Sequence, residues 1–263
     1  MIIEDLSAQP IAVVYLAISL LMLAFIEIGY QLGERLKTRN EKDTIASMGP
    51  MVGGLLAMLA FVLAFTFSLA FNQYEARKKV VVDEANAIGT AYLRADLITE
   101  PFSKEVKRLF QDYVDIRLQA AQGIDLKGAI AESVVIHKQL WEQVSSAALM
   151  QPGPNTSLAV QSINNVIDIH ELRVSAGIRN RIPGIVWVTL GVISALAMIT
   201  IGLQIGLVSK RRFLAGLPMS LAFAVVVALV VDLDRPDKGM LSVGQEAMIN
   251  LKESMTIDVS QDP

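Results

Sequence analysis

Four long apolar segments constrain the fold of this chain more strongly than any other feature. They cover residues 11–28, 48–71, 185–208 and 213–231. Each has close to the roughly 20 residues that a helix needs to cross a bilayer core about 30 Å thick. A helix also satisfies its own backbone hydrogen bonds, which lipid cannot do. We therefore predict four transmembrane helices, in preference to helices buried in the core of a soluble protein.

The composition agrees with a membrane protein and excludes several other classes. Hydrophobic residues make up 53% of the chain, and the formal net charge of -3 argues against a nucleic-acid-binding protein. The absence of cysteine excludes disulfides, thiolate metal sites and cysteine nucleophiles. Glu4 and Asp5, without any Lys or Arg, precede the first apolar segment, whereas a cleaved secretory signal begins with basic residues. We therefore expect the first helix to be retained.

The distribution of basic residues bears on orientation. Four spans place both termini and the insert between the second and third spans on one side of the membrane. The short connections on the other side, residues 35–42 and 210–212, contain seven Lys or Arg. The positive-inside rule therefore favours a cytoplasmic position for these connections and an insert outside the cell. Basic residues such as Arg77 and Arg173 also lie near the membrane on the insert's side, so the acidic N-terminal flank decides the preference.

The insert, residues 72–182, is predicted to be helical throughout. Only Gly89 interrupts the helical sequence between the second span and residue 98, so this span is predicted to continue into the first helix of the insert. Pro101, Gly123 and Pro152 mark the turns that separate four helices. Because helices joined by short turns pack against each other in opposite directions, we predict a four-helix antiparallel bundle.

These elements divide the chain into four predicted parts. They are a transmembrane hairpin (residues 1–71), the extramembrane bundle (72–182), a second transmembrane hairpin (183–231) and a C-terminal tail (232–263). Leu241, Met248 and Leu251 in the tail have near-helical spacing. An apolar stripe of this kind would allow the tail to dock on the bundle.

Both histidines of the chain fall on apolar stripes of the insert. The stripe of the third helix is Ile130, Val134, His137, Trp141, Val144 and Ala148. His137 and His170 are almost equally far from the turn near residue 153, so an antiparallel pair of helices would hold them level. Glu84 and either Asp112 or Asp115 are predicted at a similar height. Such residues form either a hydrogen-bonded polar layer or an incomplete metal site, and the first is commoner. We predict no bound metal and no cofactor.

Two apolar lines run along the second span. Phe61, Phe65 and Leu69 form one line, and Leu63, Phe67 and Phe71 form another that is roughly opposite. In a symmetric oligomer either line would stack apolar rings around a pore and gate it by dewetting, with Ser68 and Asn72 as further lining candidates. In a monomer both lines would be packing or lipid contacts, and periodicity alone favours that interpretation.

Three stretches of the chain resemble a known family. They are residues 64–77 (AFTFSLAFNQYEAR), residues 82–96 (VDEANAIGTAYLRAD) and residues 233–239 (LDRPDKG) followed by Val243. These stretches resemble a widespread family of bacterial membrane proteins labelled bestrophin-like, and the resemblance covers most of the chain. The residues that carry the motifs are Asn72, Tyr74, Glu75, Arg77, Asp83, Glu84, Asn86, Asp234, Arg235 and Pro236. The resemblance implies a multi-pass protein of the bacterial inner (plasma) membrane.

A thinner, local likeness links the chain to true bestrophins, which are pentameric anion channels whose second helix lines the pore. It rests on the patch from Asn72 to Arg77 and on the aromatic residues just before it. This likeness implies that Phe61 and Phe65, or Phe67 and Phe71, form the neck of an anion pore. It also implies a bundle in the cytosol, opposite to the orientation that the basic residues favour.

No enzymatic motif is visible. The sequence has no glycine-rich phosphate loop, no His-Glu-x-x-His helix and no nucleophile elbow, so we expect no enzyme. Two functions remain open. One is a homo-oligomeric channel, with the lipid bilayer, further copies of the chain and small anions as partners. The other is a non-conducting membrane-anchored sensor or scaffold whose bundle binds a partner or ligand. Nucleic acid is excluded as a partner.

Overall fold

The computed structural model describes residues 9–36, 42–123, 125–208, 213–235 and 239–261, and these residues form helices and no strand. In chain order the helices are α2 (Ile11–Arg35), α3 (Lys42–Arg94), α4 (Phe102–Ala121), α5 (Leu126–Met150), α6 (Pro154–Val174), α7 (Gly184–Val208), α8 (Phe213–Asp234) and α9 (Glu246–Gln261). A 3-10 turn (Ala95–Leu97) follows α3 and a π-helical turn (Ser175–Arg179) follows α6. The predicted all-helical fold is confirmed.

Four helices are long and apolar enough to cross a membrane, as predicted. They are α2, the N-terminal part of α3, α7 and α8. The chain divides into two compact units. We call residues 1–74 and 181–242 the membrane unit, because they contain the four apolar segments, and residues 75–180 and 243–263 the bundle unit. Helix α3 is unbroken from Lys42 to Arg94 and so contributes to both units.

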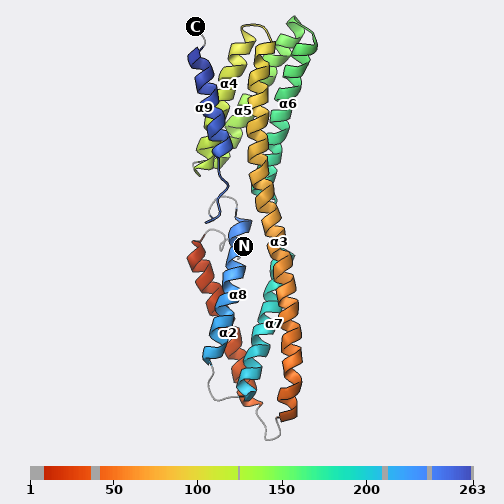
Figure 1. Ribbon diagram of the computed structural model, residues 1–263, viewed down its shortest axis with the longest axis vertical. Helices are drawn as coiled ribbons and strands as arrows, with labels where there is room; N and C mark the ends of the chain where they lie inside the picture. The colour runs from red at the N-terminus through yellow and green to blue at the C-terminus, as the bar shows by residue number, and fades with distance from the viewer. Residues whose placement is uncertain (1–8, 37–41, 124, 209–212, 236–238, 262–263) are drawn as a thin grey trace. The chain divides into compact units, whose positions relative to one another are not determined.

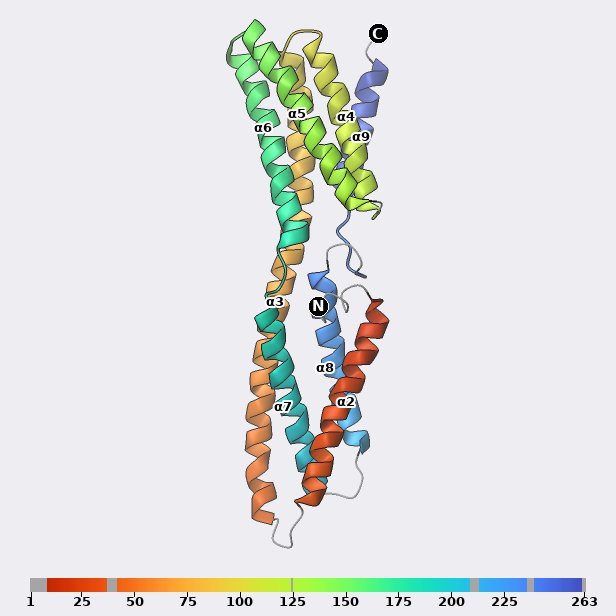
Figure 2. The same ribbon diagram turned by 180° about the vertical axis from the view of Figure 1, so that it is seen from behind.

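Glycines bring α2 and α7 together in the membrane unit. A Cβ atom at Gly29 would overlap the backbone oxygen of Ile199, and one at Gly202 would overlap that of Ile26. Gly33 and Gly206, four residues further along each helix, also face backbone atoms of the partner helix. Small residues at this spacing let helix backbones approach closely in lipid, where apolar surface alone gives little drive for association. Figure 2 shows α2 beside α7 and α8.

The bundle unit contains the C-terminal part of α3 together with α4, α5, α6 and α9, which lie side by side (Figure 1). Its core includes Ile88, Phe110, Tyr113, Leu140 and Val166, all fully or almost fully buried. Met248 and Met255 of α9 are buried in the same core. The tail therefore adds a fifth helix to the four that the insert supplies, because its methionines complete the apolar core.

The buried face of α5 differs from the predicted stripe. Val134 and Trp141 are exposed, whereas Ile136 and Leu140 are buried, so the core-facing side is rotated by about one residue. Ser133 is buried on this face because its hydroxyl donates a hydrogen bond to the backbone oxygen of Ala129 at 2.7 Å. His137 and Val144 of the predicted stripe are buried as expected, but Val134 and Trp141 are as apolar as Ile136 and Leu140, so hydrophobicity alone did not separate the two faces.

Candidate functional site

One face of α3 in the membrane unit is left uncovered by the other described residues of that unit. Phe61 and Phe65 are 73% and 56% exposed. Ser68 and Asn72 are also exposed, and Leu69 is half-buried. Because these residues follow one another at spacings of three and four, they share one side of the helix. The side carries two aromatic rings followed by two hydrogen-bonding groups.

The second predicted line on α3 faces the other way. Leu63 is only 6% exposed and belongs to the core of the membrane unit, and Phe67 packs against that core. The rings of Phe67 and Phe71 are stacked with centroids 6.1 Å apart, and Phe71 is partly exposed. Of the two lines, the one with Phe61 and Phe65 is therefore the one available to another molecule.

Residues at the C-terminal end of α8, including the motif residues Asp234 and Arg235, hold the end of the membrane unit together. The carboxylate of Asp232 accepts hydrogen bonds from the backbone N–H groups of Met240 and Leu241, at 3.0 and 3.1 Å. Asp234 accepts one from the N–H of Ile182 at 3.0 Å, and Arg235 donates to the backbone oxygen of Gln9 at 2.8 Å. Pro236 lies outside the described residues. This motif fixes the exit of α8 from the membrane, and its contacts are structural.

A layer of polar side chains crosses the core of the bundle unit, with Glu84 of α3 at its centre. The Glu84 carboxylate is fully buried and accepts a hydrogen bond from the Tyr113 hydroxyl at 2.7 Å. It forms an ion pair with Arg173 through that residue's Nη1, and Arg117 Nε lies 3.4 Å from its Oε1. Arg173 Nη2 donates to Gln245 Oε1 at 2.9 Å. The layer thus joins α3, α4 and α6 to the segment before α9.

The two histidines lie in this layer. The rings of His137 and His170 meet edge to face with centroids 4.7 Å apart, and the Tyr113 and His137 rings are 4.9 Å apart. His170 Nδ1 is 3.0 Å from the Tyr113 oxygen. The single hydroxyl proton of Tyr113 is donated to Glu84, so the Nδ1 of His170 must carry a proton and donate it to Tyr113. The neutral His170 ring therefore has its lone pair on Nε2.

Burial and neighbouring charges set the protonation states. Burial raises the pKa of the Glu84 carboxyl, but Arg173 and Arg117 lower it by more, so its pKa lies below the ordinary value and Glu84 is ionised. Burial, followed by the Glu84 charge, raises the pKa of Tyr113 well above its usual range. Burial lowers the pKa of His137 to about 4, and burial together with Arg117 lowers that of His170 to about 4. Both histidines are neutral at pH 7.

The structure brings Glu84, His137 and His170 together, but it puts the candidate aspartates elsewhere. Asp112 pairs with Arg108 at 2.6 Å, and Asp115 pairs with Lys252 of α9 at 2.8 Å. Asp112 is half exposed because its α4 position points away from the core. The aspartates are therefore not members of the layer.

Sequence reasoning missed Arg117 and Arg173 as members. Arg117 follows Phe110 and Tyr113 at spacings of three and four, so helical periodicity alone places it on the buried face of α4. Its charge nevertheless argued for an exposed position, because an arginine is rarely buried without a partner. Glu84, the partner, also lies on a helix whose neighbouring positions are charged.

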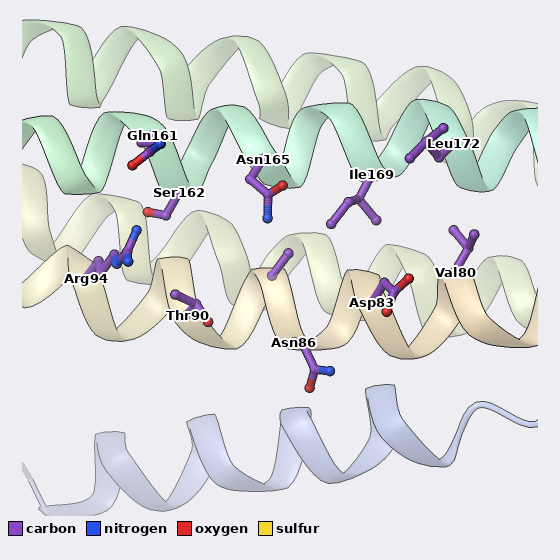
Figure 3. Close-up of a pocket in the computed structure, with 11 residues that line it drawn as sticks. Val80, Asp83, Asn86, Thr90, Arg94, Gln161, Ser162, Asn165, Ile169 and Leu172 are labelled. Carbon is purple, nitrogen blue, oxygen red and sulfur yellow. The ribbon is translucent and has the colours of Figure 1, made fainter.

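An open groove runs between α3 and α6 on the outside of the bundle unit (Figure 3), with a volume of about 580 Å³. Its walls carry the motif residue Asp83 near one end, Arg94 near the other, and amide and hydroxyl side chains between them. Asn165 of α6 points toward α3, whereas the motif residue Asn86 points away from α6. Arg94 Nη1 donates to the backbone oxygen of Leu158 at 3.3 Å. The groove offers hydrogen bonds to a polar ligand and carries opposite charges at its ends.

The remaining motif residues belong to the part of α3 around Tyr74 and Glu75, where the membrane unit ends in the sequence and the bundle unit begins. Tyr74 is half-buried, Glu75 is exposed and Arg77 is buried. Among the residues that the structure describes, no group of three or more His, Asp or Glu side chains is arranged to hold a metal ion.

The four apolar helices and the all-helical described chain define the class: a multi-pass helical membrane protein. Comparison with family models gives a match to the Bestrophin-like domain over residues 16–248. The chain belongs to the Bestrophin-like family, and the resemblance seen in its motifs is confirmed. Comparisons with curated proteins and with solved structures give no match.

Proposed function

We propose that this protein is a homo-oligomeric channel for small anions in the bacterial plasma membrane, with α3 lining the pore. The observation that carries the proposal is the uncovered face of α3 with Phe61 and Phe65 in the membrane unit. In a ring of subunits, this face would stack aromatic side chains into an apolar constriction of the kind that gates by dewetting. The edges of aromatic rings carry weak positive potential, which suits an anion.

The polar residues on the same face support a pore over a lipid contact. Ser68 and Asn72 continue the line of Phe61 and Phe65, and both are exposed in the single chain. An amide and a hydroxyl on a face that contacts only lipid would have no hydrogen-bond partner, whereas water in a pore beyond an apolar neck would satisfy both groups. Exposed small residues on α3, Gly53, Ala57 and Ala64, would let neighbouring subunits approach closely.

The alternative is a non-conducting sensor or scaffold whose bundle binds a ligand. The polar groove between α3 and α6 favours this second function, because it offers several hydrogen-bonding side chains at one accessible surface. Neither function requires catalysis, and we propose that the protein is not an enzyme.

Anion flux into liposomes tests the channel. The purified protein is first assigned an oligomeric mass, and chloride flux is then compared for wild type, Phe61→Ala and Phe65→Ala. Removing a ring from an apolar neck lowers the barrier to wetting, so we expect both variants to conduct faster than wild type by several fold. Leu196→Ala on α7 is the matched control, since Leu196 is 51% exposed on a different helix. A monomer, or a defined oligomer without flux in any variant, would refute the channel and leave the bundle as the functional part.

Orientation is tested separately. On the balance of basic residues we propose that the bundle unit lies outside the cell, whereas likeness to true bestrophins would put it in the cytosol. Because the chain has no cysteine, a thiol reagent labels only the single cysteine that is introduced, and labelling reports the side of the membrane on which it lies. Ser157→Cys at the start of α6 and Glu34→Cys at the end of α2 are both exposed positions. An impermeant maleimide added to intact cells should label Ser157→Cys and spare Glu34→Cys; the reverse pattern would place the bundle in the cytosol.

A further inference from the structure

The buried layer of the bundle unit does not balance its charges. Glu84 is the one carboxylate of the layer among the described residues, and it faces two guanidinium groups, Arg117 and Arg173. His137, His170 and Tyr113 are neutral at pH 7. The two candidate aspartates of α4 pair elsewhere, Asp112 with Arg108 and Asp115 with Lys252. The layer therefore keeps one excess positive charge inside a helical core.

The excess charge belongs to Arg117. Arg173 has acceptors for both Nη atoms, since its Nη1 pairs with Glu84 and its Nη2 donates to Gln245. The Arg117 side chain is only 5% exposed, and its Nε lies 3.4 Å from Glu84 Oε1. Its Nη1 has no hydrogen-bond partner among the described residues. A buried charged donor without an acceptor is strongly unfavourable, and native proteins supply a partner to nearly all such groups.

Two further atoms of the layer also lack a partner. The Nε2 atoms of His137 and His170 are buried and make no hydrogen bond, and both residues are more than nine-tenths buried. Arg117 lies close enough to both rings to act on their protonation. The orphaned groups thus gather in one layer, contributed by α4, α5 and α6.

We propose that this layer binds one small monovalent anion, such as a halide, against the buried guanidinium of Arg117. The excess positive charge excludes a cation, since a metal ion would add to it. The surrounding core is closely packed with apolar side chains such as Phe110, Leu140 and Val166, so the ligand must consist of one or a few atoms. This site is independent of the proposed pore, because it lies in the bundle unit and needs no conduction.

The histidines make the site sensitive to pH. In its neutral form His170 presents a lone pair at Nε2, which repels an anion, whereas both rings, once protonated, would donate hydrogen bonds to it. The groups that face them are Glu84 from α3, Tyr113 and Arg117 from α4, and Arg173 from α6, with Gln245 beyond Arg173. A bound anion offsets the repulsion that Arg117 exerts on a protonated ring. We therefore expect binding to take up a proton and to strengthen as the pH is lowered from 7.5 toward about 4, the pKa of the free rings.

Halide-dependent thermal stability of the full-length protein in detergent tests the site. Sodium bromide replaces sodium gluconate at constant ionic strength, and the Tm is followed as bromide rises. A ligand that binds the folded state raises the Tm, so we expect a saturable increase in the wild type, with half-saturation at lower bromide concentration at pH 5.5 than at pH 7.5. Arg117→Met should abolish the increase. Arg108→Met on the exposed side of α4 is the matched control and should keep it.

The outcomes separate this site from the pore. Equal Tm in bromide and gluconate for the wild type would overturn the proposal, as would an undiminished bromide effect in Arg117→Met. A bromide effect that survives Arg117→Met but disappears in Phe65→Ala would assign the ion to α3 and also overturn it. Because Arg117→Met removes a core side chain and can fail to fold, crystals of the wild type grown in bromide give a second measurement. An anomalous peak beside Arg117 Nη1 supports the anion, and an ordered water without anomalous signal refutes it.

Discussion

In the membrane unit, α2 and α7 meet through Gly29, Gly33, Gly202 and Gly206, with backbone against backbone. In the bundle unit, side chains such as Phe110, Tyr113 and Leu140 fill the space between the helices, and one layer of the core is charged. The difference follows from the surroundings. Lipid is as apolar as leucine, so close contact must hold helices together there. In a bundle, water drives apolar side chains inward, and this burial offsets the cost of a buried layer of charges.

The same difference between the two units is seen along the single helix α3. Its N-terminal part exposes Phe61 and Phe65, and its C-terminal part buries the carboxylate of Glu84. A single unbroken helix therefore has an apolar exterior in one unit and a charged interior in the other. The two tryptophans allow the units to be followed separately, because Trp141 lies on α5 and Trp187 on α7.

The largest expected effect is the loss of the central carboxylate. Glu84→Leu leaves Arg117 and Arg173 buried without their partner, which should cost about 3–5 kcal/mol of bundle stability. Denaturant unfolding followed by Trp141 fluorescence, in a Trp187→Phe background, measures this loss. Glu105→Leu is the control, since Glu105 forms an exposed pair with Arg108 and its loss should change stability by less than about 1 kcal/mol. Equal effects of the two substitutions would contradict a central role for Glu84.

A single methyl group tests the glycine contact of the membrane unit. Gly202→Ala puts a Cβ onto the backbone of Ile26, so we expect a loss of about 1–3 kcal/mol. Gly191→Ala, on the same helix, meets no atom within 4 Å and should be neutral or slightly stabilising. The measurement is unfolding followed by Trp187 fluorescence in a Trp141→Phe background. If both alanines behave alike, α2 and α7 do not depend on close approach.

Acid should weaken the bundle unit before the membrane unit. The pKa of each histidine is about 4 in the folded protein and about 6.5 when unfolded, so the unfolded state binds more protons between these values. Stability is therefore retained above pH 6.5 and falls as the pH is lowered toward 4, by about 1 kcal/mol per histidine at pH 5.5. Stability measured against pH in gluconate checks this, and His137→Gln or His170→Gln should each flatten the slope. A wild-type profile that is flat down to pH 4.5 would show that the rings are not buried in the neutral form.

The smallest effect concerns the way α9 is held. Lys252 pairs with Asp115 at 2.8 Å, but both side chains are about half exposed. Lys252→Ala should therefore cost less than about 1 kcal/mol, and high salt should remove the difference from wild type. The measurement is unfolding of the wild type and the variant with and without 1 M salt, because the Debye length at 1 M is only about 3 Å. A loss well above about 1 kcal/mol that 1 M salt removes would mean that the ion pair, and not buried Met248 and Met255, docks α9.

Periodicity predicted the helices closely. The four apolar segments, the continuous α3 and the turns at Pro101 and Pro152 all follow from local sequence, because helix formation and termination depend on neighbouring residues. The level placement of His137 and His170 followed from counting residues to the turn between their helices. The face of α5 was wrong by about one residue, since Trp141 and Val134 are as apolar as the Ile136 and Leu140 that pack.

The glycine contact and the excess charge were not predicted. Gly29 and Gly202 are far apart in the sequence, and each is an ordinary residue of a membrane helix until the two helices meet. From the sequence alone Arg117 is likewise expected to be solvated, and only the folded structure shows that it is buried beside Glu84. Pairing across helices depends on their relative rotation, which no single helix specifies.

The amino-acid sequence by itself determined the class, the family motifs and the number of apolar helices, because these depend on composition and local periodicity. The sequence also predicted Glu84 beside the two histidines and the docking of the tail on the bundle. Only the tertiary structure decided which face of α3 stays uncovered, that Asp112 and Asp115 stay outside the layer, and that Met248 and Met255 are the buried residues of α9. Each of these depends on contacts between residues distant in the chain, and such contacts are set by the close packing of side chains from several helices at once.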